Sequence, residues 1–244
     1  MITAVTAFVP IPDHPRTAKE YCDLGARLLA VDIPILFAEG DLERCWLYEY
    51  LRSKYDSPQD FTCSVGDNPE KNSLAYHCVQ AQKTEFLEIA SIFNPFADVF
   101  VWIDYGIFHL PGMTSEIISD FFRRAESEQA IAIPGCWERD SFVYDDNRPC
   151  WRFCGGVMVV PRKYVRAFNI SMKQEYLRWL DHTGNISWEV NALARMELVE
   201  PELPIWWYGP CDHDASMFTN YKATEHADAR RSPVLAQRNE GVER

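Results

Sequence analysis

A short apolar run constrains this chain more than any other feature: residues 99–103 (VFVWI) lead directly into Asp104. A continuous apolar run of this length, followed by a turn signal such as Gly106, is typical of a strand buried on both faces of a parallel sheet. We therefore predict that residues 99–103 form a central strand with almost no exposure. Asp104 then lies where the strand leaves the core, at the edge of the sheet where ligands gather. The alternatives for Asp104 are a turn aspartate and a carboxylate that binds a metal or another ligand.

Further short apolar strands alternate with amphipathic helices along the sequence. The expected strands are residues 3–9, 33–37, 99–103, 130–133, 153–160 and 204–208, and residues 33–37 are expected to be buried. The expected helices are residues 17–31, 41–51 capped by Asp41, 73–93, a helix capped by Ser115, 162–180, and a helix that starts at Ser187. This alternation predicts an α/β fold, a single three-layer α/β/α domain with a mostly parallel central sheet.

The length and charge of the chain limit its organisation and its partners. The 244 residues fit one domain over residues 1–221, followed by a charged tail over 222–244 that we expect to be mobile. The net charge of −12 argues against nucleic acid as a partner, because broad contact with a phosphate backbone needs clustered Lys and Arg. No apolar stretch is long enough for a transmembrane segment, and the first residues lack the basic region of a signal peptide. We therefore expect a cytoplasmic protein.

The eight cysteines are scattered along the chain without a Cys-x-x-Cys pair. Cys136, Cys150 and Cys154 offer possible ligands for a zinc site, but the usual ligand spacing and a clear fourth ligand are missing. Reduced and mostly buried thiols are therefore the expected state.

Candidate functional residues follow the ends of the first and last predicted strands. Phe8 and Arg16 belong to the first strand and the loop after it, where Arg16 is either a phosphate ligand or a plain surface residue. The triplet Asp212-His213-Asp214 follows the last strand. Its mixed nitrogen and oxygen atoms suit Mn²⁺ or Mg²⁺, and a solvated turn is the alternative.

Four further candidate residues lie between these two strands in the sequence. Gly155 and Gly156 permit the close approach of a ligand to the backbone, or they form a simple bulge. Glu189 falls in the first turn of a predicted helix, where the helix dipole should keep the carboxylate ionised and lower its pKa. A mere dipole partner is the alternative for Glu189. Lys83 is expected on the polar side of its helix.

The order of these motifs along the chain resembles that of a known protein family. The segments VTAFV, VFVWIDYGIFH, CGGVMVVP, SWEVNAL and WWYGPCDHD look like those of the bacterial HtrL-type (WlaTC-like) glycosyltransferases of the GT-A fold. The resemblance extends over most of the chain to about Tyr221 and lies in the combination and order of the segments. It implies a glycosyltransferase that moves a sugar from a nucleotide-diphosphate sugar, with a UDP-hexose as the expected donor, to a hydroxyl group of a glycan or another acceptor. The alternative is a catalytically inactive GT-A-like module that binds a sugar nucleotide or a glycan.

The resemblance also implies a metal site. Asp104 takes the first position of the Asp-x-Asp motif that binds the metal and the diphosphate, and His213 takes the place of the final metal ligand. Gly106 stands where the family has the second aspartate, so Asp212 or Asp214 would have to complete a site for Mn²⁺ or Mg²⁺. Without a metal, Lys83 or Arg16 would have to neutralise the diphosphate. The residues expected to bind the donor are Phe8, Arg16, Lys83, Asp104, Gly106, Gly155 and Gly156.

The resemblance assigns catalysis to Glu189. In an inverting reaction Glu189 would deprotonate the acceptor hydroxyl, and in a retaining reaction it would orient the donor sugar. The aromatic-rich segment 134–152, which contains Trp137, Tyr144 and Trp151, is expected to cover the acceptor side of the site.

Overall fold

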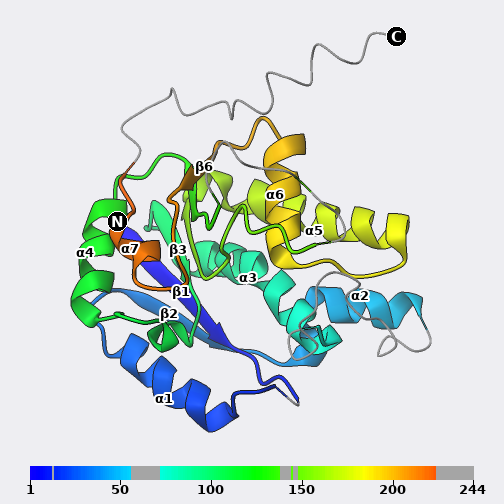
Figure 1. Ribbon diagram of the computed structural model, residues 1–244, viewed down its shortest axis with the longest axis horizontal. Helices are drawn as coiled ribbons and strands as arrows, with labels where there is room; N and C mark the ends of the chain where they lie inside the picture. The colour runs from blue at the N-terminus through cyan, green and yellow to red at the C-terminus, as the bar shows by residue number, and fades with distance from the viewer. Residues whose placement is uncertain (13, 56–71, 138–143, 145–147, 224–244) are drawn as a thin grey trace.

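A six-stranded sheet with helices on both faces forms the centre of the molecule (Figure 1). This computed structural model describes residues 1–12, 14–55, 72–137, 144 and 148–223. The predicted tail lies outside the described residues from position 224 onward, and so do residues 138–143 and 145–147 of the predicted aromatic segment. No helix in the described ranges combines the length and the apolar character needed to cross a membrane.

The sheet has the order β2-β1-β3-β5-β4-β6. The strands are β1 (Ile2–Phe8), β2 (Ile35–Glu39), β3 (Val99–Ile103), β4 (Ile131–Pro134), β5 (Val157–Pro161) and β6 (Ile205–Tyr208). The pairs β1–β2, β1–β3 and β4–β6 are parallel, whereas β5 is antiparallel to both β3 and β4. The prediction of a mostly parallel sheet is therefore confirmed. The carboxyl ends of β1, β3, β4 and β6 and the beginning of β5 all meet at one edge of the sheet, which we call the rim.

Strand β3 is buried on both faces, as its apolar run predicts. Phe100 and Trp102 pack into one hydrophobic cluster, and Val101 and Ile103 pack into a second cluster on the opposite face. Trp102 is 3% exposed and Ile103 is 0% exposed. The prediction of a central strand at residues 99–103 is therefore confirmed.

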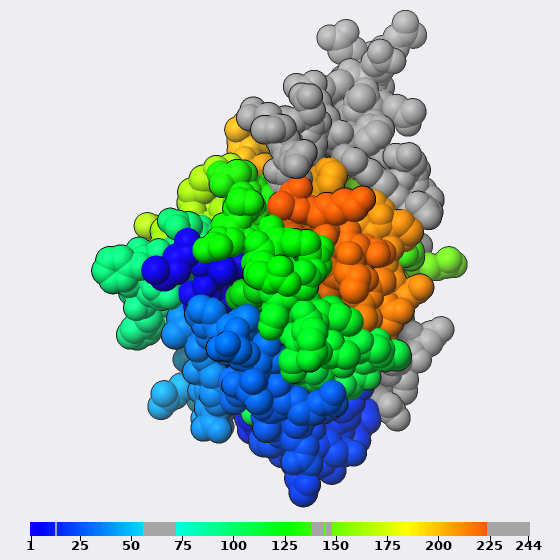
Figure 2. Space-filling view, turned by 90° about the vertical axis from the view of Figure 1, so that its left-hand side faces the viewer, coloured from blue at the N-terminus to red at the C-terminus, as the bar shows by residue number. Residues whose placement is uncertain are grey.

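Helices cover each face of the sheet, which gives the predicted three layers. One layer contains α2 (Trp46–Lys54), α3 (Leu74–Phe93), α5 (Arg162–Thr183) and α6 (Glu189–Val199). The opposite layer contains α1 (Ala18–Leu29), α4 (Ser115–Ala125) and the short α7 (Ser216–Thr219). Figure 2 shows this second side, where α1 in blue, α4 in green and the chain after β6 in orange lie next to one another.

The prediction that residues 33–37 form a buried strand is wrong in position and in burial. Strand β2 begins at Ile35 and lies at the edge of the sheet, where its residues are only partly covered. Phe37 is 40% exposed and stacks on the ring of Tyr105 at a centroid distance of 5.1 Å. An edge strand has a neighbouring strand on one side alone, so its residues are less covered than those of a central strand. The apolar composition of residues 33–37 does not reveal whether the strand lies at the edge or in the centre of the sheet.

Two predicted helix starts are also shifted. Asp41 caps the short 3-10 helix η1 (Leu42–Arg44) instead of an α-helix, because its carboxylate accepts a hydrogen bond from the Glu43 amide at 3.1 Å. The α-helix α2 follows with Cys45 before its first residue. At α4 the capping side chain belongs to Thr114, one residue before the predicted Ser115. Asp41 and Thr114 each satisfy one free amide at the start of the helix that they cap, whereas α2 has no side-chain cap at Cys45.

His77 on α3 gives the stability of this fold a specific dependence on pH. The side chain is 0% exposed, and neither ring nitrogen has a hydrogen-bond partner among the described residues. The ring instead lies against Tyr76 and Trp188, at centroid distances of 5.6 and 5.7 Å. Burial lowers the pKa of His77 from 6.5 to about 4, so the folded protein keeps a neutral imidazole.

We expect the free energy of unfolding to fall as the pH drops below about 6.5. Below this pH the His77 imidazole binds a proton in the unfolded chain but not in the folded chain. This single group therefore lowers the free energy of unfolding by up to about 3 kcal/mol between pH 6.5 and 4. Urea unfolding of the wild type and of His77→Phe at pH 7 and pH 5 measures the effect. Relative to the wild type, the variant should have a higher free energy of unfolding at pH 5 than it has at pH 7. An equal difference at both pH values would contradict the prediction.

Candidate active site

A cavity of about 420 Å³ opens at the rim of the sheet. This volume falls within the range of about 300–1,000 Å³ that is common for small-molecule sites. Its walls come from the ends of β1 and β3, the residues before β5, the helices α1, α3 and α6, and the loop after β6. The cavity brings together nine of the residues selected from the sequence: Phe8, Arg16, Lys83, Asp104, Gly106, Gly155, Gly156, Glu189 and His213. Asp212 is exposed and does not line it.

Lys83 joins the two candidate carboxylates inside this cavity. Its ammonium lies 3.0 Å from Asp104 Oδ1 and 3.1 Å from Glu189 Oε2, and it donates a third hydrogen bond to the Gly155 carbonyl at 2.9 Å. A lysine ammonium has three donors, so all of them are used within the protein. The side chain is only 4% exposed, which corrects the prediction that Lys83 lies on the polar side of its helix. Helix α3 turns this residue toward the rim instead of toward solvent.

Burial and charge set the protonation of this cluster. Burial raises the pKa of Glu189 to about 7, against the opposing effect of the nearby Lys83 cation. The predicted direction for Glu189 is therefore wrong, because desolvation of the carboxylate outweighs a helix dipole. Burial by itself lowers the pKa of Lys83, but Asp104 and Glu189 together raise it, so the ammonium stays charged. At neutral pH, Glu189 can therefore both lose and accept a proton.

The start of α6 sets the position of Glu189. The helix begins at Glu189 itself, with Trp188 in the N-cap position and no side-chain cap, so the predicted start at Ser187 is two residues early. Glu189 faces the backbone of Gly155 so closely that a Cβ at that glycine would lie 2.2 Å from Glu189 Oε2. The predicted approach of a ligand to the glycine pair therefore stays a prediction at Gly155, where a carboxylate already lies against the backbone. The group that approaches is a side chain of the protein itself.

Trp102, in the strand that precedes Asp104, helps to fix the position of the Asp104 carboxylate. Its Oδ1 accepts a hydrogen bond from Trp102 Nε1 at 2.7 Å in addition to the contact with Lys83, and its amide donates to the Gly156 carbonyl at 3.0 Å. The side chain remains 36% exposed. These contacts engage Oδ1, so Oδ2 is the oxygen that can accept hydrogen bonds from a ligand in the cavity.

The residues do not fit the expected Mn²⁺ or Mg²⁺ site. Asp104, Asp212 and His213 do not form a group of converging ligands among the described residues. Asp214 is not part of such a group either, and its carboxylate accepts a hydrogen bond from the Ser216 amide at 2.7 Å beside α7. Hard divalent cations need several oxygen ligands, and here Asp104 provides a single carboxylate that already faces Lys83. We therefore assign no step of a reaction to such an ion.

Aromatic side chains that sequence reasoning did not select complete the cavity. Tyr76 and Trp188 line it together with Trp151, and the ring of Trp188 lies 6.1 Å from that of Tyr76 and 5.9 Å from that of Trp151. One signal for Tyr76 was available, since it precedes Lys83 by seven residues and therefore lies on the same face of the helix. Trp151 belongs to the aromatic segment expected on the acceptor side.

Fold and site together define an α/β protein with a ligand cavity at the carboxyl rim of its sheet. No protein-family model matches the chain, and no curated protein matches it. Among solved structures, the chain is similar to a glycosyltransferase involved in the glycosylation of the major capsid of PBCV-1. The identity is 12% and the TM-score is 0.48, with 86% of this chain and 81% of that chain covered. Membership of the HtrL-type family stays a prediction.

Proposed function

We propose that this protein is a glycosyltransferase that moves a sugar from a nucleoside-diphosphate sugar, with a UDP-hexose as the expected donor, to a hydroxyl acceptor. The observation that carries the proposal is the cluster of the buried Glu189 and Lys83 with the partly exposed Asp104 at the wall of the rim cavity. It combines a carboxyl group whose pKa is about 7 with a second carboxylate that offers an oxygen to ligand hydroxyls. The order of sequence motifs supports the same function.

Glu189 is the proposed catalytic residue. In the transfer, the bond between the anomeric carbon and the diphosphate oxygen breaks, and its electron pair leaves with the diphosphate. The acceptor oxygen forms the new bond to the anomeric carbon and gives up its proton. A pKa near 7 suits a group that takes this proton at neutral pH, which favours the base role of Glu189 over sugar orientation alone.

The negative charge of the leaving diphosphate needs a cation. All donors of Lys83 are engaged by Asp104, Glu189 and Gly155, so this lysine acts as a positioning residue that holds the two carboxylates. Arg16 also lines the cavity, where its guanidinium lies 5.8 Å from the centre of the Tyr21 ring. A guanidinium can bind a phosphate through two parallel hydrogen bonds. We therefore assign the diphosphate to Arg16.

Release of free nucleoside diphosphate tests this function. The full chain is incubated with a panel of nucleoside-diphosphate sugars, with and without glycan acceptors, and the released diphosphate is quantified by chromatography. We expect release with at least one donor, and an increase when an acceptor is present. Melting temperatures in the same panel report donor binding, since a ligand at about 100 times its Kd stabilises the fold by about 2.7 kcal/mol.

Variants separate the roles of the residues in this assay. Arg16→Ala should weaken donor binding, while the exposed Arg123→Ala should leave it unchanged. A donor that raises the melting temperature without any release would instead identify an inactive binding module. The replacement of the second motif aspartate by Gly106 is the observation that favours this second candidate. The absence of both binding and release would overturn the proposal.

A further inference from the structure

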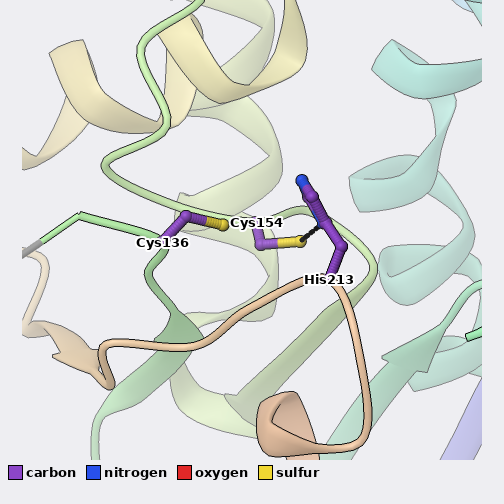
Figure 3. A group of neighbouring side chains, drawn as sticks. All are labelled: Cys136, Cys154 and His213. Atoms are coloured by element: carbon purple, nitrogen blue, oxygen red, sulfur yellow. Dashed lines mark hydrogen bonds between the residues drawn. The ribbon is translucent and has the colours of Figure 1, made fainter. Parts of the chain in front are cut away.

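The chain carries a second group of side chains with metal-binding chemistry, next to the cavity but outside the carboxylate cluster. Cys136, Cys154 and His213 each offer one ligand atom, and these atoms all lie within 4.8 Å of one another. Figure 3 shows the three side chains gathered between separate segments of the chain, with a dashed line from the Cys154 sulfur to the His213 ring. The distance from Cys154 Sγ to His213 Nδ1 is 3.7 Å.

The fold brings these residues together although they are far apart in the sequence. Cys136 follows β4, Cys154 precedes β5 and His213 follows β6, and these strands are neighbours in the sheet. Backbone hydrogen bonds tie the same segments to one another. The amide of Cys154 donates to the Pro134 carbonyl at 2.7 Å, and the amide of Cys211 donates to the Gly135 carbonyl at 2.7 Å. The ligand atoms are therefore presented from a connected backbone.

From this arrangement we propose that Cys136, Cys154 and His213 form a binding site for Zn²⁺. In tetrahedral zinc sites the Zn–S and Zn–N distances are about 2.3 and 2.0 Å, which places neighbouring ligand atoms roughly 3.5–3.8 Å apart. The separation of 3.7 Å between Cys154 Sγ and His213 Nδ1 lies within that range, and the other two separations are at most 4.8 Å. Small side-chain adjustments therefore close the site around an ion.

The ligand types select the metal. Two thiolates and an imidazole are soft or borderline ligands, which favour Zn²⁺ over the oxygen-preferring Mg²⁺ and Mn²⁺. The thioether of Met217 lies 3.7 Å from the Cys154 sulfur and adds to the sulfur-rich surroundings. His213 was expected to complete a manganese site with Asp104, whereas the thiols beside it indicate a different ion. The sequence had suggested Cys150 as a third thiol, but among the described residues the converging ligand atoms are those of Cys136, Cys154 and His213, so His213 takes the third position.

A zinc ion at this position would connect three strand ends at the wall of the cavity. Cys154 and His213 both line the cavity, whereas Cys136 does not. With three protein ligands, one coordination position is left for water or for a ligand. The proposed site does not depend on the transfer reaction, so a failure of one proposal leaves the other standing.

Zinc titration of the full chain tests the site. The reduced, chelator-treated protein is titrated with Zn²⁺ in competition with a chromophoric chelator, and bound metal is counted by elemental analysis. We expect one equivalent of Zn²⁺ per chain and a higher melting temperature in the zinc-bound protein. Co²⁺ in place of Zn²⁺ should give the near-ultraviolet absorption of cobalt–thiolate bonds.

Variants assign the ligands. Cys136→Ser, Cys154→Ser and His213→Ala should each weaken zinc binding by more than about 100-fold, beyond the 10–100-fold cost of losing an outer-sphere partner. His213 is exposed, so its variant keeps the test valid if the buried Cys154→Ser fails to fold. Cys22→Ser, at an exposed cysteine on α1, should bind zinc like the wild type. A lack of stoichiometric binding, equal affinity for Mn²⁺, or a thiol count that reveals a Cys136–Cys154 disulfide would overturn the proposal.

Discussion

Replacing Glu189 with glutamine should lower the turnover of sugar transfer by about 10²-fold or more, which is the scale of a positioned acid–base group. The substitution keeps the shape of the side chain and removes its charge. Donor binding should change far less, because Glu189 does not contact the proposed diphosphate ligand Arg16. In the wild type, kcat/KM should rise with pH through about 7, where the Glu189 carboxyl loses its proton. Steady-state rates of both proteins between pH 5.5 and 8.5 measure this difference, and the variant should lack the rise.

A matched control exists for this experiment. Glu116 also lies in the first turn of a helix, α4, but on the exposed surface, so Glu116→Gln should leave turnover unchanged. The raised pKa of Glu189 means that its ionised form is disfavoured in the folded protein, so Glu189→Gln should be at least as stable as the wild type at pH 8. Near-normal turnover combined with a lower melting temperature would instead show that Glu189 is only structural.

Removing the cation of the buried pair Arg152–Glu197 should destabilise the fold by about 3–5 kcal/mol. Arg152 is fully buried and binds Glu197 through two hydrogen bonds, from Nε and Nη2, both of 2.9 Å. The rings of Phe153 and Trp207 lie on the guanidinium at 5.6 and 5.4 Å. Arg152→Met leaves the Glu197 carboxylate in a nearly dry environment without its partner. Urea unfolding at pH 7.5 gives the free energy of unfolding directly.

The double variant shows whether the unpaired charge is the cause. Arg152→Met combined with Glu197→Leu removes both charges and should recover most of the stability lost in the single variant. Arg123→Met breaks an exposed pair with Asp120 and should change the free energy of unfolding within error. Equal instability of the single and the double variant would mean that lost packing, and not the isolated carboxylate, causes the effect.

The fold could be predicted from the sequence where one local pattern decides the outcome. The apolar run of β3 has a single reasonable explanation, and the alternation of strands and helices restricts the architecture to a few layered folds. Errors arose where the outcome depends on neighbours in space. The run at Ile35 does not reveal that its strand has a neighbour on one side alone. The choice between Thr114 and Ser115 as a cap depends on backbone angles that two adjacent polar residues can both adopt.

The candidate site was accessible to sequence reasoning as a set of residues, but its chemistry was not. Strand ends identified Asp104 and His213, because parallel strands deliver their carboxyl ends to one rim, whereas the glycine pair lies there because it precedes the antiparallel β5. The protonation of Glu189 depends on burial, which no local pattern reveals, so the direction of its pKa was predicted wrongly. The partners of Lys83 and His213 come from distant parts of the chain. Only the assembled sheet places Cys136 beside Cys154 and His213.

The reversed direction of β5 has a consequence for how this protein can diversify. Because β4 ends at the rim and β5 begins there, the chain between Pro134 and Cys154 leaves and re-enters the sheet at the same place. Its two ends are fixed to each other by the backbone hydrogen bond between these residues. Doubling the length of a segment with fixed ends costs only about 0.6 kcal/mol of closure entropy. Insertions in this segment that leave Cys136 and Arg152 in place can therefore extend the wall of the cavity at a small cost in stability, while the sheet and the carboxylate cluster stay unchanged.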